Sequence, residues 1–179
     1  MIIESTLTKK EKNSVQKKII HFIIKFPGVR YRELMRLTGL SNGVLTYHLN
    51  KLDHSGKVKI DRINNRVTRY YSSDISDEES KILAVLRPKS TRSVLMFISD
   101  HDQCSFNEIV DYINKVPSTV SWHLMRLKES DMIRIRRQKD YNIYELSIDK
   151  SFLLDTLQKY NNSLNSDIVE DYVEMMEEF

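Results

Sequence analysis

The strongest constraint on this chain is an internal repeat with a period of 75 residues. When the sequence is shifted on itself by that distance, residues 46–52 (TYHLNKL) lie over residues 121–127 (SWHLMRL) without a gap. Two copies are too few for a solenoid, which needs about three repeats to bury a continuous core. The repeat therefore predicts two small domains of the same fold. Identical residues extend the match on both sides, in the pairs Phe22/Phe97, Ile23/Ile98, Glu33/Glu108, Ser55/Ser130, Ile60/Ile135 and Arg62/Arg137.

The first copy predicts three helices followed by a β-hairpin. Apolar residues at helical spacing over residues 15–26 indicate the first helix, which a Pro-Gly pair ends. A shorter second helix is expected over residues 30–37, and Ser41 can cap a third. Two β-rich runs, residues 57–61 and 67–71, flank a turn and complete the hairpin.

The second copy predicts the same order of elements. Glu108 follows Ser105 by three residues, a pattern that caps a helix start. Between the copies, Ser76 and Glu79 form the same pattern and predict a short helix that Pro88 ends. The helices of the second copy are expected over residues 91–99, over residues 105–113 and from Pro117, with strands over residues 133–137 and 142–146.

Three helices with a tight turn between the second and third, followed by a β-hairpin wing, define a winged helix-turn-helix. The predicted fold class is therefore α+β, mainly α with small β-hairpin wings. The predicted layout is a winged domain over residues 1–75, a helical linker over 76–89, a second winged domain over 90–149 and an acidic amphipathic helix over 150–179.

Both copies resemble the winged domains of the ArsR and MarR groups of prokaryotic transcription regulators. The resemblance rests on residues 41–58 and 121–133, extends over roughly 10–148, and in its tandem form is similar to archaeal regulators with two winged domains. It implies a regulator that binds double-stranded DNA in a sequence-specific way. Two positions depart from the pattern, because Asp131 replaces the Gly56 of the first copy and Met125 lies where a polar base contact is expected.

In such a fold the third helix enters the major groove and the wing contacts the phosphate backbone. An apolar stripe of leucines must face the core, so the other residues of that helix point outward. Asparagine can pair with adenine there, and Lys or Arg can meet phosphates. In the first copy the predicted DNA contacts are Asn42, Gly43, Thr46, Tyr47, Asn50, Lys51, Lys59, Arg62, Arg66 and Arg69. In the second copy they are Ser118, Thr119, Ser121, Trp122, Arg126, Arg134, Arg136, Arg137 and Lys139.

The charge distribution favours the same partner. The whole chain carries only +3, but residues 151–179 hold seven acidic residues and a single base. Residues 1–150 therefore carry 27 bases against 18 acids, a net charge of +9 that suits a polyanion.

The acidic end has an apolar seam with steps of three or four residues, which predicts an amphipathic helix. We expect this seam to pair with a second chain and form a homodimer, and the alternative is that it folds back on the second winged domain. Its members are Leu153, Leu157, Tyr160, Leu164, Ile168, Tyr172, Met175 and Phe179.

The sequence contains few residues that would support another class of function. Residues 100–104 (DHDQC) match no metal-ligand spacing, and we expect a surface turn with a lone thiol there. His48 and His123 are expected to pack or to meet phosphate rather than to bind metal. No cofactor and no catalysis are expected, since nucleophile-elbow, P-loop and HExxH motifs are missing. Without an apolar run of membrane length or a signal peptide, the chain is expected to be cytoplasmic, away from membranes.

Two alternatives to a plain DNA-binding regulator remain open. Winged domains also serve as protein-interaction scaffolds in chromosome segregation and basal transcription, and a scaffold should expose apolar surface in place of a basic wing. The second alternative is a regulator that also senses a metal or another ligand, whose small-molecule effector the sequence does not reveal.

Overall fold

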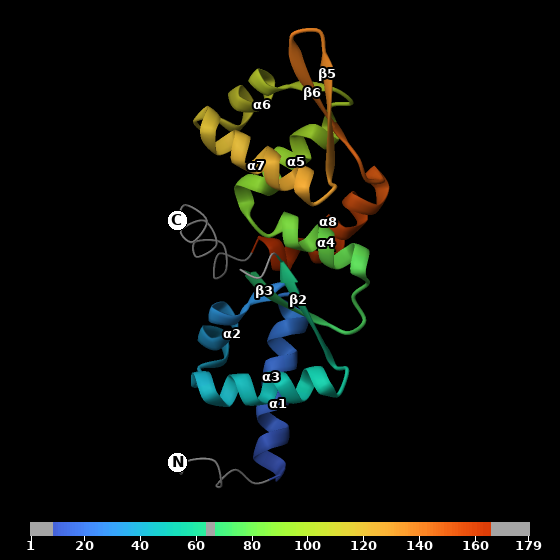
Figure 1. Ribbon diagram of the computed structural model, residues 1–179. Helices are drawn as coiled ribbons and strands as arrows, with labels where there is room; N and C mark the ends of the chain where they lie inside the picture. Colours follow the sequence, from blue (N-terminus) through green and yellow to red (C-terminus); the bar gives the residue numbers. More distant parts are fainter. Residues whose placement is uncertain (1–8, 64–66, 166–179) are drawn as a thin grey trace. The chain divides into compact units, whose positions relative to one another are not determined.

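The computed structural model describes residues 9–63 and 67–165, and the chain divides into two compact units, Met1–Ser80 and Lys81–Phe179. Each unit combines helices with one small antiparallel sheet (Figure 1). The fold class is therefore α+β, of the winged-helix type, as predicted. None of the helices in the described part of the chain has the length and hydropathy needed to span a membrane.

The first unit follows the predicted order of helices and hairpin. Its sheet has the strand order β1-β3-β2, so β3 is the central strand. A further helix, α4, begins at the end of this unit. The elements are α1 (Lys9–Lys25), β1 (Val29–Arg30), α2 (Tyr31–Thr38), α3 (Asn42–His54), β2 (Val58–Ile63), β3 (Val67–Ser72) and α4 (Asp77–Leu86).

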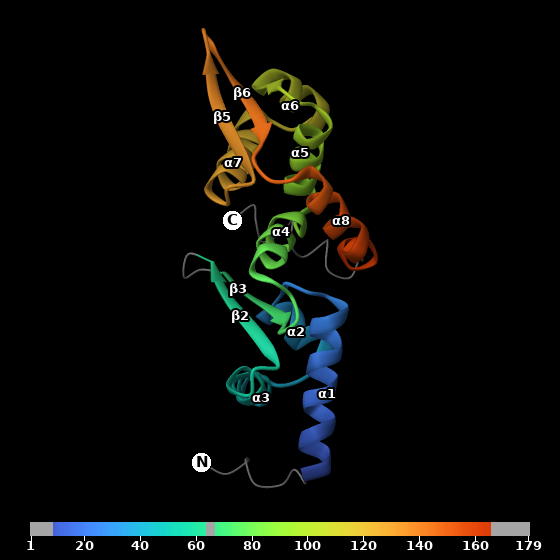
Figure 2. The same cartoon turned by 90° about the vertical axis from the view of Figure 1, so that its right-hand side faces the viewer.

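The second unit repeats this arrangement, with the strand order β4-β6-β5. In both views its β5–β6 hairpin projects beyond the helices of the unit (Figures 1 and 2). Its elements are α5 (Lys89–Asp100), β4 (Cys104–Ser105), α6 (Phe106–Ile113), α7 (Pro117–Glu129), β5 (Ile133–Gln138), β6 (Tyr141–Leu146) and α8 (Lys150–Leu164).

The 75-residue offset holds from β1 to β2, and then it changes. The third strands, β3 and β6, are offset by 74 residues, because the wing turn of the second unit is one residue shorter. Asp131 keeps the turn of its counterpart Gly56, since both have a positive φ, 57° and 64°. Aspartate tolerates this left-handed region better than most residues. The departure at Asp131 therefore leaves the backbone of the repeat intact.

Two short strands, β1 and β4, were not predicted, because a run of two residues has no periodicity to detect. Each pairs with the central strand of its sheet, as in the contact of Cys104 with Tyr144. Residues 100–103 are exposed, as expected of a surface turn, but the expectation that Cys104 belongs to this turn is wrong, since its side chain is buried and its thiol donates to the Tyr144 carbonyl over 3.5 Å. Burial raises the pKa of Cys104 to about 11, which disfavours the reactive thiolate.

The described part of the C-terminal seam folds back on the second unit. Leu153 and Leu164 of α8 are fully buried in its core, and Leu157 and Tyr160 pack partly against it. The Arg87 guanidinium donates to the Ser163 hydroxyl over 3.0 Å. Along Lys150–Leu164 the structure therefore shows the fold-back arrangement, which the sequence left as the alternative. Four members of the seam lie outside the described residues, namely Ile168, Tyr172, Met175 and Phe179.

Because α8 completes the core, we expect Leu153→Ala to destabilise the second unit by about 2–5 kcal/mol through the lost burial and the cavity left behind. The matched control is Leu154→Ala on the next residue, whose side chain is 39% exposed. Urea unfolding should show a clearly lower free energy of unfolding for Leu153→Ala and little change for Leu154→Ala. Equal effects would show that α8 does not belong to the core.

Candidate nucleic-acid interface

The outward face of α3 carries the polar residues that the sequence assigned to it. Leu45, Leu49, Leu52 and His48 are buried and fix the helix against the core of the first unit. Asn50 lies on the opposite face and is exposed. So are the other outward residues predicted from the sequence, Asn42, Gly43, Thr46 and Tyr47. Side chains that can meet base edges or phosphates thus lie together on one helix.

Tyr31 holds the first turn of α3, a role that the sequence analysis missed. Its hydroxyl donates to Asn42 Oδ1 over 2.6 Å and lies 2.8 Å from Thr46 Oγ1. Tyr31 is the first residue of α2, so it ties the two helices of the helix-turn-helix together. The second copy has Phe106 at this position. This difference between the two copies was the sequence signal that could have singled out the Tyr31 hydroxyl.

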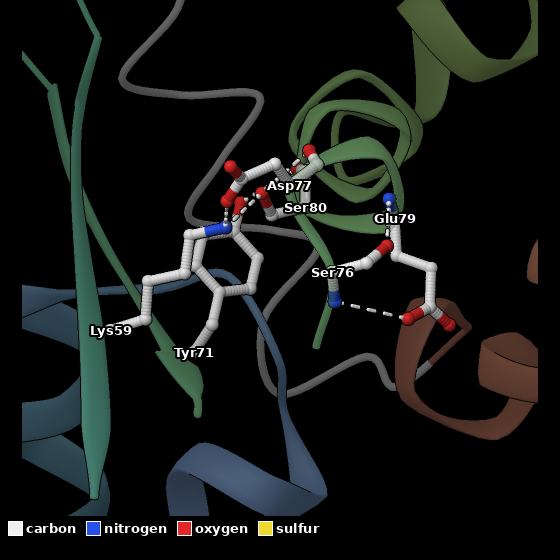
Figure 3. A network of polar contacts seen from close by, with 6 residues as sticks. All are labelled: Lys59, Tyr71, Ser76, Asp77, Glu79 and Ser80. Carbon is white, nitrogen blue, oxygen red and sulfur yellow. Dashed lines mark hydrogen bonds and ion pairs between the residues drawn. The ribbon is translucent and has the colours of Figure 1, made fainter. Parts of the chain in front are cut away.

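The wing of the first unit offers fewer cations than its sequence suggests. Arg62 on β2 is exposed, as is Lys51 on the preceding helix α3, whereas Arg66 lies outside the described residues. Lys59 forms an ion pair with Asp77 and donates to the Ser80 hydroxyl over 2.9 Å at the start of α4 (Figure 3). The Tyr71 hydroxyl joins this network by donating to the Ser80 carbonyl over 3.1 Å. Lys59 is therefore already engaged inside its own unit.

Arg69 corrects the sequence-based assignment. It was expected to contact phosphate, but its side chain is fully buried and its guanidinium donates to the Gly28 carbonyl over 2.9 Å. The unpredicted strand β1 explains the error, because Arg69 pairs with Arg30 of β1 and therefore lies on the central strand of the sheet. Arg69 supports the sheet and is not available to a phosphate in this fold.

The equivalent helix of the second unit, α7, presents a less polar face. Ser118 and Ser121 are exposed, while Thr119 is half-buried. Trp122 is also half-buried, and the Arg126 guanidinium lies 4.9 Å from the centre of its ring, a cation–π contact. Met125 is 51% exposed at the position that Asn50 occupies on α3.

The two repeated histidines are buried on the inner faces of their helices. His123 Nδ1 lies 2.8 Å from the Thr91 hydroxyl, and His48 packs edge-on against Tyr47. Across the residues that the structure describes, no three His, Cys, Asp or Glu side chains cluster in a way that could hold a metal ion.

The wing of the second unit carries the densest basic cluster of the chain. Arg134 and Arg136 are exposed and lie two residues apart on β5, so their side chains share one face of the strand. Both pair with Glu145 on the neighbouring strand, Arg134 over 2.7 Å, and Glu145 is only 4% exposed. Arg137 and Lys139 extend the exposed positive charge toward the tip.

Glu145 must stay ionised for this arrangement to hold. Burial alone would raise its pKa, but hydrogen bonds from Arg134 and Arg136 outweigh burial and lower the pKa below its ordinary value of 4.5. A carboxylate with a lowered pKa in the folded state contributes stability above its unfolded pKa, and this contribution is lost as the pH falls through the folded value.

We therefore expect Glu145→Gln to lower the stability of the second unit at neutral pH. The difference from the unmodified chain should begin to shrink near pH 4.5, where the unfolded chain takes up the proton, and should vanish at lower pH once folded Glu145 is protonated as well. Urea unfolding at a series of pH values measures this difference. Glu129→Gln, the same change at an exposed side chain, is the control. A difference for Glu145→Gln that is constant down to the lowest pH would contradict the assigned ion pairs.

The Tyr31 bridge leads to a second expectation. Tyr31→Phe keeps the ring and removes the hydroxyl, so the first turn of α3 should loosen and the first unit should lose about 0.5–1.5 kcal/mol. The affinity for a selected DNA site should fall as well. Tyr112→Phe, which makes the same change at a 63% exposed side chain of α6, should alter neither quantity. If Tyr31→Phe alters neither the stability nor the DNA affinity, the hydrogen bonds from Tyr31 do not hold α3.

A comparison with protein families gives one match. The model of the bacterial regulatory protein family arsR matches residues 89–134, which run from the start of α5 into β5. This match covers less than half of the chain and lies in the second unit. It supports a winged-helix regulator that binds DNA. No curated protein matches the chain.

Solved structures with similar folds include three of different kinds. Reduced HlyU from Vibrio cholerae N16961 is 19% identical, with a TM-score of 0.41 over 46% of this chain and 90% of its own. A chain of the ESCRT-II endosomal trafficking complex is 12% identical, with a TM-score of 0.39 over 83% and 98%. The mRNA-binding domain of elongation factor SelB from E. coli, in complex with SECIS RNA, is 11% identical, with a TM-score of 0.32 over 79% and 100%. No TM-score here reaches 0.5, so the functional assignment rests on the chain's own residues and the family match.

Proposed function

We propose that this chain is a sequence-specific double-stranded DNA-binding transcription regulator. The observation that carries the proposal is the outward face of α3, where Thr46, Tyr47 and Asn50 are exposed while the leucine stripe is buried. A helix with this face fits the major groove, where asparagine can pair with adenine and a threonine methyl can contact thymine. The chain acts by binding and not by catalysis.

In this proposal, cations on and near the wings contact the phosphate backbone of the DNA. Lys51 and Arg62 in the first unit, and Arg137 and Lys139 in the second, are exposed cations near the third helices and on the hairpins. Contacts of this kind fix the position of a protein on the duplex and carry no base information. The proposal keeps α3 as the principal base-contacting helix, since α7 has Met125 in place of Asn50.

The organisation of the protein on DNA also belongs to the proposal. Two winged units in one chain favour the archaeal type of tandem regulator. Occupancy near a promoter would then block or assist the transcription machinery. A selection of bound sequences from a random DNA pool, followed by light scattering on the complex, tests both the specificity and the stoichiometry.

The salt dependence of binding provides the first test. If several cations meet phosphates, log K should fall linearly with log salt concentration, with a slope of roughly −0.9 per phosphate neutralised. Fluorescence anisotropy with a labelled duplex measures this slope. A flat response, or no affinity at low salt, would reject DNA binding and favour the protein-interaction scaffold.

Substitutions should separate base contacts from backbone contacts. Asn50→Ala should weaken the selected site by roughly 1–3 kcal/mol and random DNA much less, because a base contact is lost. Arg137→Ala should weaken both duplexes equally and reduce the salt slope by roughly one contact. If the two variants behave alike on both duplexes, α3 is not the base-contacting helix.

A further inference from the structure

The outward face of α7 differs in chemistry from that of α3. Ser118, Trp122, Met125 and Glu129 follow one another at steps of three or four residues, so they share the side opposite the buried Val120, Leu124 and Leu127. The middle of this face is apolar, because Met125 is half exposed and lies one turn from Trp122. A sulfur and an indole that remain in contact with water make a poor base-contacting surface and a good surface for a peptide.

Positive charge surrounds this apolar centre. The Arg126 guanidinium stacks on Trp122, and Lys128 is exposed on the next turn. Residues 115–140, which include α7 and the following strand, hold seven bases against three acids. The surface therefore suits a ligand that is both apolar and acidic.

Residues 166–179 have this combination. The segment SDIVEDYVEMMEEF contains six acidic residues, no lysine or arginine, and seven apolar side chains. It stands in contrast to the rest of the chain, which is basic. Its charge and its apolar content are complementary to the α7 face.

The segment begins in the same unit as that face. Arg92, on the first turn of α5, donates to the Leu164 carbonyl over 3.0 Å and to Asn165 Oδ1 over 3.3 Å. The neighbouring residue, Thr91, contacts His123 of α7 over 2.8 Å, and His123 adjoins Trp122. Helix α5 thus contacts both the end of α8 and the buried face of α7 within one unit. A segment of 14 residues can extend to roughly 46 Å, several times the ~10–12 Å diameter of a helix.

We propose that residues 166–179 dock on the outward face of α7 in the same chain. Apolar side chains of the segment cover Trp122 and Met125, and its carboxylates pair with Arg126 and the cations of the second wing. The docking itself does not depend on the proposed function, whereas its effect on DNA binding rests on it. The segment and the DNA backbone compete for one surface, so the full chain binds DNA through its second unit more weakly than a chain without the segment.

Trp122 is the sole tryptophan of the chain, so its fluorescence reports directly on this surface. The test compares the full chain with a chain that ends at Asn165, which keeps the whole of α8 and the core of the second unit. Truncation should shift the Trp122 emission to longer wavelength and raise its quenching by acrylamide. A synthetic peptide of residues 166–179 should reverse both changes, and a peptide with its six acids replaced by Gln and Asn should not. Identical emission and quenching in the two chains would overturn the proposal.

Two further measurements make the test specific. Met125→Asn, which copies Asn50 of the first unit, should weaken the effect of the peptide on Trp122 in the truncated chain, and an undiminished effect would place the docking site elsewhere. Light scattering should give the mass of a monomer for both chains. The Trp122 fluorescence of the full chain should not change on dilution. A signal lost on dilution together with a falling mass would assign the segment to a second copy and overturn docking within one chain.

DNA binding is measured separately, so that the two proposals fail in different ways. The truncated chain should bind DNA more tightly than the full chain, and the peptide should compete with DNA. If neither chain binds DNA while the Trp122 changes persist, the proposed function fails and the docking stands. If both chains bind DNA equally and Trp122 is unaffected, the docking fails and the proposed function stands.

Discussion

Burial of the third helix is the interaction on which the other features of each unit depend. In the first unit Leu45, Leu49 and Leu52 enter the core, and in the second unit Val120, Leu124 and Leu127 do the same. Once this stripe is buried, the rotation of the helix about its axis is fixed, because its apolar residues recur with the helical period. The outward residues then follow from sequence spacing alone. A recognition surface is thus positioned by residues that never touch the ligand.

The same reasoning explains which parts of the structure could be predicted. The helices and hairpins, and the exposed face of α3, follow from periodicity and capping patterns that act within a few residues. The burial of Arg69 and Cys104 could not be predicted, because it depends on pairing between segments far apart in the chain. Arg69 was assigned to the surface as a cation of the wing, since the pairing of its strand with β1 was not predicted. The fold-back of α8 was missed as the first choice because an apolar seam is equally suited to its own core and to a second chain.

On the third helices, the differences between the two units lie mainly at the surface. The buried positions of α3 and α7 keep similar apolar residues, since volume changes in a packed core cost several kcal/mol. Outward positions carry no such constraint, and there Asn50 is replaced by Met125 and the Tyr31 hydroxyl is lost at Phe106. The two units therefore share one architecture while offering different chemistry to a partner. This divergence is the physical basis for assigning base contacts to the first unit and peptide docking to the second.

The wing of the second unit shows why cations counted in a sequence overstate the charge available for DNA. Arg134 and Arg136 neutralise one buried carboxylate, so together they present about one net positive charge. A phosphate that approaches them must compete with Glu145, whose carboxylate both guanidinium groups already contact. In the first unit Lys59 is engaged by Asp77 in a comparable way. The effective positive charge of both wings is therefore concentrated in residues outside these pairs, such as Arg62, Arg137 and Lys139, and the internal carboxylates determine which cations remain for the backbone.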